Sequence, residues 1–366
     1  MKPLKYIVLI LAIIAGVAFW GCHPSDEKKQ NSKETIKIGA ILPLTGRYAD
    51  FGHWTKAGLM LAAEELNHAQ KDYEFSIFIE DAKSEVKDAI SAYNKLINMD
   101  EVKIVLASSS SFSLAIKPKA IEDDILFFSI ASHPEITVNN NGKIFRPCNT
   151  SVEEGELISN YILETFDPSH EKAYILYYNS EFGLSFKDQF SNQLGNMVIG
   201  SNSFEDNPEA FKTIALKTIS QNPDVVIAIG FTPSLGVLIK TLRDLNYKGK
   251  IVSNVGFLIP SVIKTAGEAA KGVLYVDYKT PTSSKHFTQL DSLSQQRYKT
   301  NFASISYLAY FTMKLIDYSI SQTLSTEIND IAAFLNKPQV IILDEISMTT
   351  HENGNILPGL EIKEFQ

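Results

Sequence analysis

The class of fold is decided by a stretch near the start of the chain, Ile36-Lys-Ile-Gly-Ala-Ile-Leu-Pro-Leu-Thr-Gly-Arg-Tyr-Ala-Asp-Phe-Gly52, which runs into Gly58-Leu-Met-Leu-Ala-Ala-Glu-Glu-Leu-Asn67. The apolar run Ile36–Leu42 predicts a buried strand, and Pro43 ends it. The next segment, Thr55–His68, predicts a helix because its apolar residues recur at helical spacing. A strand followed at once by a helix is the unit of a parallel α/β fold.

The same alternation continues along the chain. After the first helix come predicted strands at Phe75–Ile79, Val102–Ala107 and Ile125–Ile130, separated by helices over Val86–Ile97 and from the serine run to about Asp123. A second series starts near Ser151 and closes with the extended segment Gly272–Tyr278. Two consecutive α/β sets of similar size predict two doubly wound parallel-sheet lobes. Beyond them, the patterns predict helices at Phe302–Ile320 and Ile328–Leu335, a strand at Gln339–Leu343 and a final extended segment at Ile356–Phe365.

The first residues have the pattern of an export signal. Two lysines precede the apolar run Tyr6–Trp20, which is shorter than the roughly twenty residues that span a bilayer. Gly21-Cys22 follows where a bacterial lipoprotein carries its lipidated cysteine, so residues 1–21 are predicted to be a signal peptide. Residues 22–35 are then expected to form a polar tether. An uncleaved N-terminal anchor is the alternative, and either interpretation puts the folded part outside the cytoplasmic membrane.

Composition narrows the classes of function. The chain has 366 residues, of which 45% are hydrophobic and 21% charged, an ordinary composition for a globular protein. This length exceeds what one hydrophobic core usually serves, so two domains are expected. A net charge of −8 disfavours nucleic acid as a partner, because phosphates would be repelled. Only Cys148 remains beyond Cys22, and it is predicted to be a buried, inert thiol; a catalytic thiol is the alternative.

Motifs of catalysis and metal binding are absent from the sequence. There is no GxGxxG after the first strand, no phosphate-binding GxxxxGK[ST], and no HExxH, GxSxG or CxxC. The seven histidines have no i+3 or i+4 spacing, so we expect neither a metal site nor a cofactor. The adjacent carboxylates Asp123-Asp124 and Glu153-Glu154 are predicted to lie on solvated faces. An exported two-lobed protein without a catalytic motif is interpreted as a binding protein and not an enzyme.

The opening segment resembles the start of type I periplasmic binding proteins, and most closely the leucine/isoleucine/valine-binding proteins of ABC transporters. Other motifs agree in order and spacing over nearly all of residues 36–365: Ala107-Ser-Ser-Ser-Ser111, Phe145-Arg146, Glu154-Gly155, Tyr177-Tyr-Asn-Ser-Glu-Phe-Gly183, Pro223-Asp-Val-Val-Ile-Ala-Ile-Gly230, Gly267-Glu-Ala-Ala-Lys-Gly272 and His351-Glu-Asn-Gly-Asn355.

The resemblance implies a type I periplasmic binding fold, whose two lobes are joined by a three-strand hinge. The first lobe is expected to hold residues 36–149 and 281–342, and the second residues 150–280 and 343–366. It also implies a small-molecule ligand buried by hinge closure, an ABC permease as partner, and a monomer with no cofactor.

Candidate ligand contacts follow the predicted strands. Ser109 and Ser110 can offer hydroxyls and helix N–H groups to a carboxylate, although one of them could serve only as a helix cap. The resemblance adds Ala131 and Ser132, with His133 as a substitute for Ser132. It also adds aromatic positions around the ligand, which could instead be plain packing: Phe51, Phe182 and Phe231, with Tyr48 as a further candidate.

One departure from the resemblance concerns the ligand's charge. The amino-acid-binding members carry an acidic residue after the strand that corresponds to Lys250–Ser253, and it pairs with the ligand ammonium. Here the loop reads Asn254-Val255-Gly256. Asn254 remains a candidate ligand contact, but the missing acid favours a neutral or anionic ligand over an α-amino acid. An acid could still reach the cleft from elsewhere, for instance Glu181 or Asp206.

Two functions remain open from sequence. The first is a lipid-anchored, extracytoplasmic solute-binding protein that delivers an amino acid or related small acid or amide to an ABC permease. The second is an envelope sensor, regulatory protein or scaffold that kept the fold without transport. An enzyme is a more distant alternative, because no nucleophile–base pair is visible.

Overall fold

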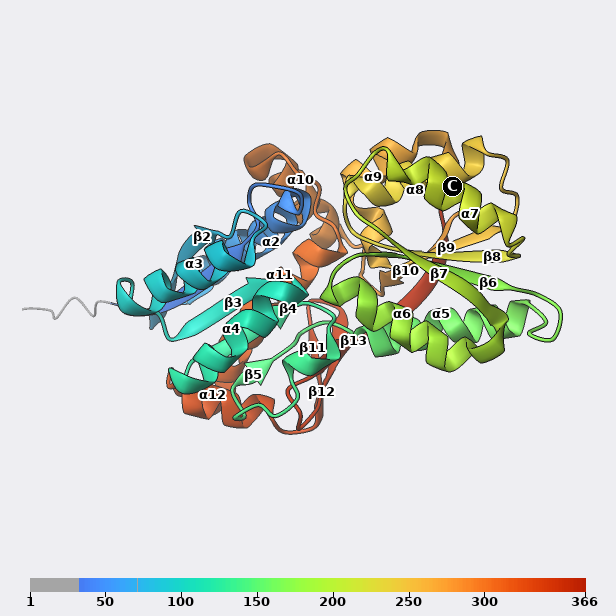
Figure 1. Cartoon of the computed structure of the whole chain (residues 1–366). Helices are drawn as coiled ribbons and strands as arrows, with labels where there is room; N and C mark the ends of the chain where they lie inside the picture. The colour runs from blue at the N-terminus through green and yellow to red at the C-terminus, as the bar shows by residue number, and fades with distance from the viewer. Residues whose placement is uncertain (1–32, 71) are drawn as a thin grey trace, which may run out of the picture.

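Five parallel strands in the first 145 residues form the sheet of the first lobe (Figure 1). The computed structural model describes residues 33–70 and 72–366, so the predicted signal peptide, Cys22 and most of the tether lie outside the described residues. The strand order is β2-β1-β3-β4-β5, with bounds β1 (Glu34–Leu42), β2 (Tyr73–Asp81), β3 (Ile104–Ser108), β4 (Leu126–Ile130) and β5 (Ile144–Phe145).

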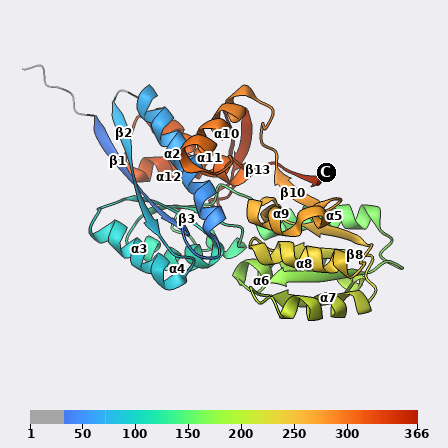
Figure 2. The ribbon, with the colours of Figure 1, turned by 90° about the horizontal axis from the view of Figure 1, so that it is seen from above.

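Helices cover both faces of this sheet, as expected for parallel strands that are buried on both sides. Figure 2 shows α3 (Val86–Asn98) and α4 (Ser110–Glu122) on one face, with α2 (Ala49–Ala69) and α11 (Ser304–Thr323) on the other. The contact between α2 and α11 is very close at Gly58. A Cβ atom on Gly58 would lie 1.8 Å from the carbonyl oxygen of Ser306, so only glycine fits there.

The second lobe has a six-stranded sheet of order β14-β10-β9-β8-β6-β7. All neighbours are parallel except β14, which pairs antiparallel with β10 at one edge. The strands are β6 (Ala173–Tyr178), β7 (Val198–Phe204), β8 (Val225–Ile229), β9 (Lys250–Ser253), β10 (Leu274–Tyr278) and β14 (Leu360–Glu364). Figure 1 shows α5 (Ser151–Thr165) and α6 (Glu181–Leu194) on one face of this sheet, and α7 (Ala210–Ser220), α8 (Pro233–Asp244) and α9 (Pro260–Ala266) on the other.

The C-terminal segment does not pass to the second lobe at residue 343, where the lobe boundary was expected. Strands β11 (Gln339–Leu343), β12 (Ile346–Thr350) and β13 (Ile356–Pro358) form a separate antiparallel sheet. Its side chains Ile341, Ile346 and Met348 are buried, and β11 packs against α11, which belongs to the first lobe. Only β14 crosses to the second lobe, so the predicted extended segment Ile356–Phe365 is two strands in two sheets, separated by Gly359.

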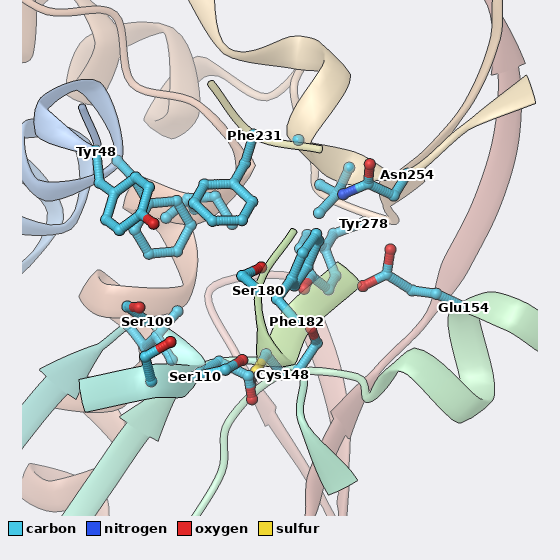
Figure 3. A pocket seen from close by; sticks show the side chains of 18 residues that line it. Tyr48, Ser109, Ser110, Cys148, Glu154, Ser180, Phe182, Phe231, Asn254 and Tyr278 are labelled. Carbon is cyan, nitrogen blue, oxygen red and sulfur yellow. Dashed lines mark hydrogen bonds between the residues drawn. The ribbon is translucent and has the colours of Figure 1, made fainter. Parts of the chain in front are cut away.

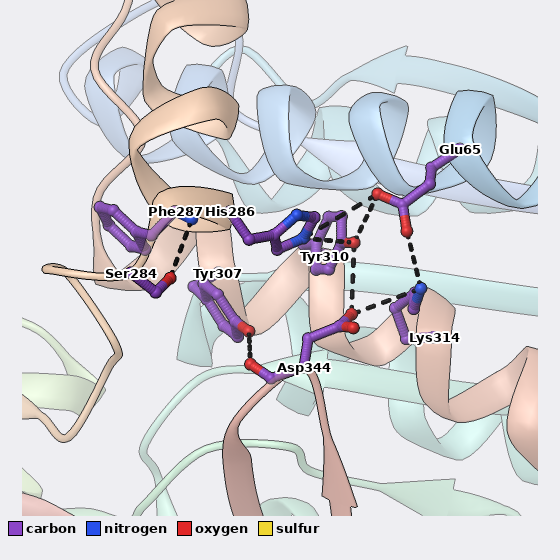
Figure 4. A network of polar contacts seen from close by, with 8 residues as sticks. All are labelled: Glu65, Ser284, His286, Phe287, Tyr307, Tyr310, Lys314 and Asp344. Atoms are coloured by element: carbon purple, nitrogen blue, oxygen red, sulfur yellow. Dashed lines mark hydrogen bonds and ion pairs between the residues drawn. The ribbon is translucent and has the colours of Figure 1, made fainter.

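A polar network explains why the β11–β12 hairpin stays with the first lobe (Figure 4). Its two turn residues, Asp344 and Glu345, have positive φ, as a tight hairpin requires. The Asp344 carbonyl accepts from Tyr307 Oη at 2.8 Å, and its carboxylate lies 3.3 Å from Lys314 Nζ. Lys314 also pairs with Glu65 of α2 at 2.8 Å, so helices α2 and α11 and the hairpin are held by one ammonium group.

Three helices follow the second lobe in sequence but pack on the first: α10 (Lys285–Tyr298), α11 and α12 (Ile328–Leu335). The sequence patterns missed α10 because it is mostly polar and buries only Phe287, Leu290 and Ser294. None of the helices in the described part of the chain has both the length and the apolar character needed to cross a bilayer.

The chain passes between the lobes three times: between β5 and α5, between β10 and α10, and between β13 and β14. The buried Arg146, in the first crossing, donates from Nη2 to Asn355 Oδ1 at 2.5 Å, which ties it to the segment before the third. The N–H of Lys279 in the second crossing donates to the carbonyl of Gly359 in the third at 2.8 Å. The three crossings are therefore hydrogen-bonded to one another.

Replacing Gly58 with alanine is expected to lower the free energy of unfolding by about 1–3 kcal/mol or more, because the added methyl group would force α11 away from α2. Gly155→Ala is the control, since the three atoms nearest to its added Cβ all belong to the side chain of Gln189 and none to the backbone. Urea unfolding followed by circular dichroism measures both. Equal stability of the two variants would contradict the close packing of α2 on α11.

Candidate functional site

A cavity lies between the two lobes at the carboxyl ends of the strands of both sheets (Figure 3). The first lobe contributes the end of β4, the start of α4 and the first turn of α2, together with Ile305 of α11. The second lobe contributes the loops after β6, β8 and β9, the start of α5, and Tyr278 at the end of β10. Ligands of open α/β sheets bind at such edges.

All nine residues predicted as ligand contacts line this one cavity: Tyr48, Phe51, Ser109, Ser110, Ala131, Ser132, Phe182, Phe231 and Asn254. Residues more than 200 positions apart in sequence are brought together because parallel strands end at a common edge. His133, which was considered as a substitute for Ser132, is not among the lining residues. Its Nδ1 accepts instead from the N–H of Glu135 at 3.3 Å.

The serine loop has an unusual backbone at its first residue. Ser109 is the N-cap residue of α4, yet its φ is 95° and its side chain makes no capping hydrogen bond. A positive φ in a residue other than glycine is a strained conformation that is concentrated at functional sites. The alternative that Ser109 serves only as a cap therefore lacks the hydrogen bond it requires. The Ser109 and Ser110 hydroxyls and the first turn of the 13-residue α4 form a ready site for a negative group.

Aromatic rings form one wall of the cavity, with Phe231 at their centre. Its ring centroid lies 4.9 Å from that of Tyr48, 4.8 Å from Phe182 and 5.5 Å from Tyr178. The contact with Tyr48 joins the two lobes across the cavity. Phe231 thus packs against other rings and lines the cavity at once, so the two roles left open by the sequence are both compatible with its position.

Three buried polar atoms of lining residues have no hydrogen-bond partner among the described residues: Ser132 Oγ, Glu154 Oε2 and Asn254 Nδ2. Buried polar groups are normally paired, so unpaired ones that line a cavity indicate a polar occupant. The Asn254 Oδ1 atom is already used, because it accepts from the N–H of Gly230 at 3.1 Å.

Glu154 corrects one of the sequence-based expectations. It was predicted to lie on a solvated face next to Glu153, but its side chain is buried, with 1% of the residue exposed. Glu154 is in the first turn of α5, whose capping box uses Thr150 and Glu153 and turns the next side chain inward. Burial raises the pKa of the Glu154 carboxyl to about 8, although a hydrogen bond from the Val255 N–H opposes part of that shift.

The two acids considered from sequence do not line the cavity. Asp206 is occupied by three hydroxyl donors, from Tyr178 at 2.8 Å, Thr232 at 3.0 Å and Ser234 at 2.6 Å. Glu181 has a side chain that is 59% exposed, and its carboxylate lies 4.0 Å from His133 Nε2.

Several lining residues were missed by sequence reasoning as ligand contacts, among them Glu154, Ser180, Tyr278 and Ile305. Tyr278 ends β10, as Ser132 and Phe231 follow the ends of their strands, so the strand-end rule was a signal that could have found it. Cys148 also lines the cavity. It is a buried thiol as expected, and burial raises its pKa to about 12. Such a thiol is protonated at neutral pH and a poor nucleophile.

One cluster of metal-ligating side chains lies elsewhere, in the network of Figure 4. Ligand atoms of Glu65, His286 and Asp344 all lie within 4.8 Å of one another. Lys314 Nζ pairs with both carboxylates, at 2.8 and 3.3 Å. The ammonium group already supplies the positive charge that a cation would bring, so the cluster is best described as an ion-pair network.

Comparison with known proteins places this geometry in a family. A model of the periplasmic binding protein family matches residues 35–337. The Leu/Ile/Val-binding protein homolog 3 of Brucella melitensis is 24% identical over 300 residues, which cover 80% of each chain.

Two solved structures illustrate how widely the fold is used. A branched-chain amino acid transporter substrate binding protein from Streptococcus pneumoniae, in complex with isoleucine, superposes with a TM-score of 0.81 at 19% identity and covers 91% of this chain and 97% of its own. An ABC transporter solute binding protein from Rhodopseudomonas palustris, in complex with 3,4-dihydroxybenzoic acid, gives 0.78 at 16% identity, with 91% and 93% coverage. The chain has their two-lobed type I fold, and on the extent of the family match it belongs to the periplasmic binding protein family.

Proposed function

We propose that this protein is a lipid-anchored, extracytoplasmic solute-binding protein that captures a small polar molecule between its lobes and delivers it to an ABC permease. The ligand is an amino acid or a related small organic acid or amide. Closure about the three crossings buries it, and the permease recognises the closed form. Binding, and not catalysis, is its task, as in the family to which it belongs.

The observation that carries this proposal is the cavity itself. It is shared by two lobes, has aromatic walls, and is bordered by a few convergent polar groups, the combination expected of a small-molecule site. The named relatives support transport over sensing, because they are amino acid-binding and ABC transporter proteins. The export signal and Gly21-Cys22 support a lipid anchor.

The serine loop is tested by changing Ser109 and Ser110 together to alanine. Binding is expected to weaken by about 1–3 kcal/mol, the cost of leaving buried ligand groups without partners. The ligand is first found by thermal-shift screening against the twenty amino acids, small organic acids and amides, and its affinity is then measured by calorimetry.

The matched control for this variant changes two exposed helical serines, Ser91 and Ser220, to alanine, and should bind as the wild type does. Unchanged affinity in the Ser109/Ser110 variant would exclude these hydroxyls as ligand contacts.

The lipid anchor is tested by Cys22→Ser. The variant is expected to lose its lipid and to leave the membrane fraction, as shown by mass spectrometry and fractionation. Cys148→Ser removes the chain's other cysteine and should keep the lipid. Retention of the Cys22→Ser protein in the membrane at full length would favour an uncleaved N-terminal anchor instead.

A further inference from the structure

The interlobe cavity contains one carboxylate among its described lining residues, Glu154, and no lysine, arginine or histidine. The Oε2 atom of Glu154 has no hydrogen-bond partner among the residues that the structure describes, and the residue is almost completely buried. Figure 3 shows the carboxyl group turned toward the space between Tyr278 and Asn254. A buried carboxylate without a counter-charge is costly, so it is either protonated or paired with a positive group that the protein does not supply.

Among the described residues, no cation is one of the groups that act on Glu154. The buried guanidinium of Arg146 acts instead on Cys148, Glu153 and Tyr278, and it donates to the His133 carbonyl and to Asn355 Oδ1. The charged group that acts on it is Glu153 of its own helix, which is like-charged. Tyr278 of β10 and Cys148 of the first crossing are acidic groups whose own pKa values rise chiefly through burial and partly through Glu154.

The described elements that pack against α5 do not direct a free positive charge toward Glu154. From α6, Gln189 faces the neighbouring Gly155. On β14, the ammonium of Lys363 is occupied by Asp277 and Glu361, each at 2.9 Å. On the side of η3 (Val255–Leu258), the Val255 N–H is the donor that reaches Glu154.

Asn254 cannot take the place of an acid here. Its Oδ1 is committed to the Gly230 N–H, which leaves the Nδ2 donor unpaired. A donor repels an ammonium group, whereas a carboxylate oxygen accepts from it with a charge-assisted hydrogen bond. The acid that is missing after β9 is therefore available from another element, the first turn of α5.

We propose that Glu154 is a specificity-determining residue that binds a protonated amine of the ligand. The inference rests on the proposed function and narrows its ligand class. The amine lies at Glu154, a carboxylate lies at the Ser109–Ser110 loop, and an apolar body lies against Phe182 and Phe231. The ligand is thus a zwitterion with an apolar side chain, and the expectation of a neutral or anionic ligand drawn from Asn254 is reversed.

The first test compares ligands that differ only in the amine. The probes are the twenty L-amino acids, the carboxylic acids that lack their α-amino group, and two aromatic acids, benzoate and 3,4-dihydroxybenzoate. Thermal shift at pH 8 and then calorimetry are expected to find binding among the amines alone. Glu154→Gln should weaken that binding at least tenfold. Glu156→Gln is the matched control with unchanged affinity, because Glu156 is exposed on the same helix and is not among the groups that act on Glu154.

The outcomes separate this inference from the proposed function. Binding of an acid without an amine, with Glu154→Gln binding as well or better, would leave the solute-binding function standing and overturn the role of Glu154. An amine bound equally by wild type and Glu154→Gln would do the same. Failure of every probe to bind would contradict the inference and would leave only the amides of the proposed ligand class.

The second test is a pH profile, which a purely structural role would not produce. An ionised Glu154 is needed to bind the amine, and its pKa is raised from the ordinary 4.5 to about 8. Affinity of the wild type should therefore rise from pH 6 to pH 8, by up to about tenfold per unit, and Glu154→Gln should show a flat profile. Parallel profiles would overturn the inference. Should Glu154→Gln fold poorly by circular dichroism, a flat wild-type profile would overturn it alone.

Discussion

The geometry of parallel strands is the constraint on which the rest of this protein depends. Each strand of a parallel sheet must be followed by a crossover that returns the chain to the opposite edge, so the carboxyl ends all meet at one edge. In this chain the two such edges face each other across the cavity. Every loop that leaves a strand on that side delivers its first residues to the same place, and polar side chains of different lobes converge without being near in sequence.

Three crossings join the two lobes, and the closure proposed for this protein would take place about them. A single connection would leave the lobes free to rotate, whereas three that are hydrogen-bonded to one another restrict the motion to bending. Arg146 is central to the arrangement because its buried guanidinium donates to His133 and Asn355, which belong to distant parts of the chain. The close contact of α2 with α11 at Gly58 and the Lys314 network make the first lobe a firm support for this hinge.

Which ligand a protein of this fold binds depends on a few side chains at the carboxyl ends of the strands, and not on the fold itself. The same architecture holds isoleucine in one solved protein and 3,4-dihydroxybenzoic acid in another. A carboxylate is common to both ligands, and a serine loop at a helix N-terminus is suited to such a group. Under the inference drawn for Glu154, ligands are distinguished at the opposite end of the cavity, where charge is expensive to bury and must be matched. Glu154 lines the cavity here, and no cation of the described residues is among the groups that act on it.

Local sequence determined the strands and helices that build both lobes. Burial of one or both faces of an element makes its apolar residues recur at a regular spacing, and this spacing is visible without knowing what packs against the element. Local sequence also placed Ser109 after a predicted strand, whereas Ala131, Phe182 and Phe231 were identified through the resemblance to a known family.

Only the tertiary structure decided features that depend on packing between distant segments. The mostly polar helix α10 has no clear period, and the β11–β12 hairpin joins the first lobe through Lys314 and Tyr307, which lie on α11. Glu153 and Glu154 are chemically alike in sequence, yet one caps α5 and the other faces the cavity. Burial of a carboxyl group is set by what packs around it, and no local pattern contains that information.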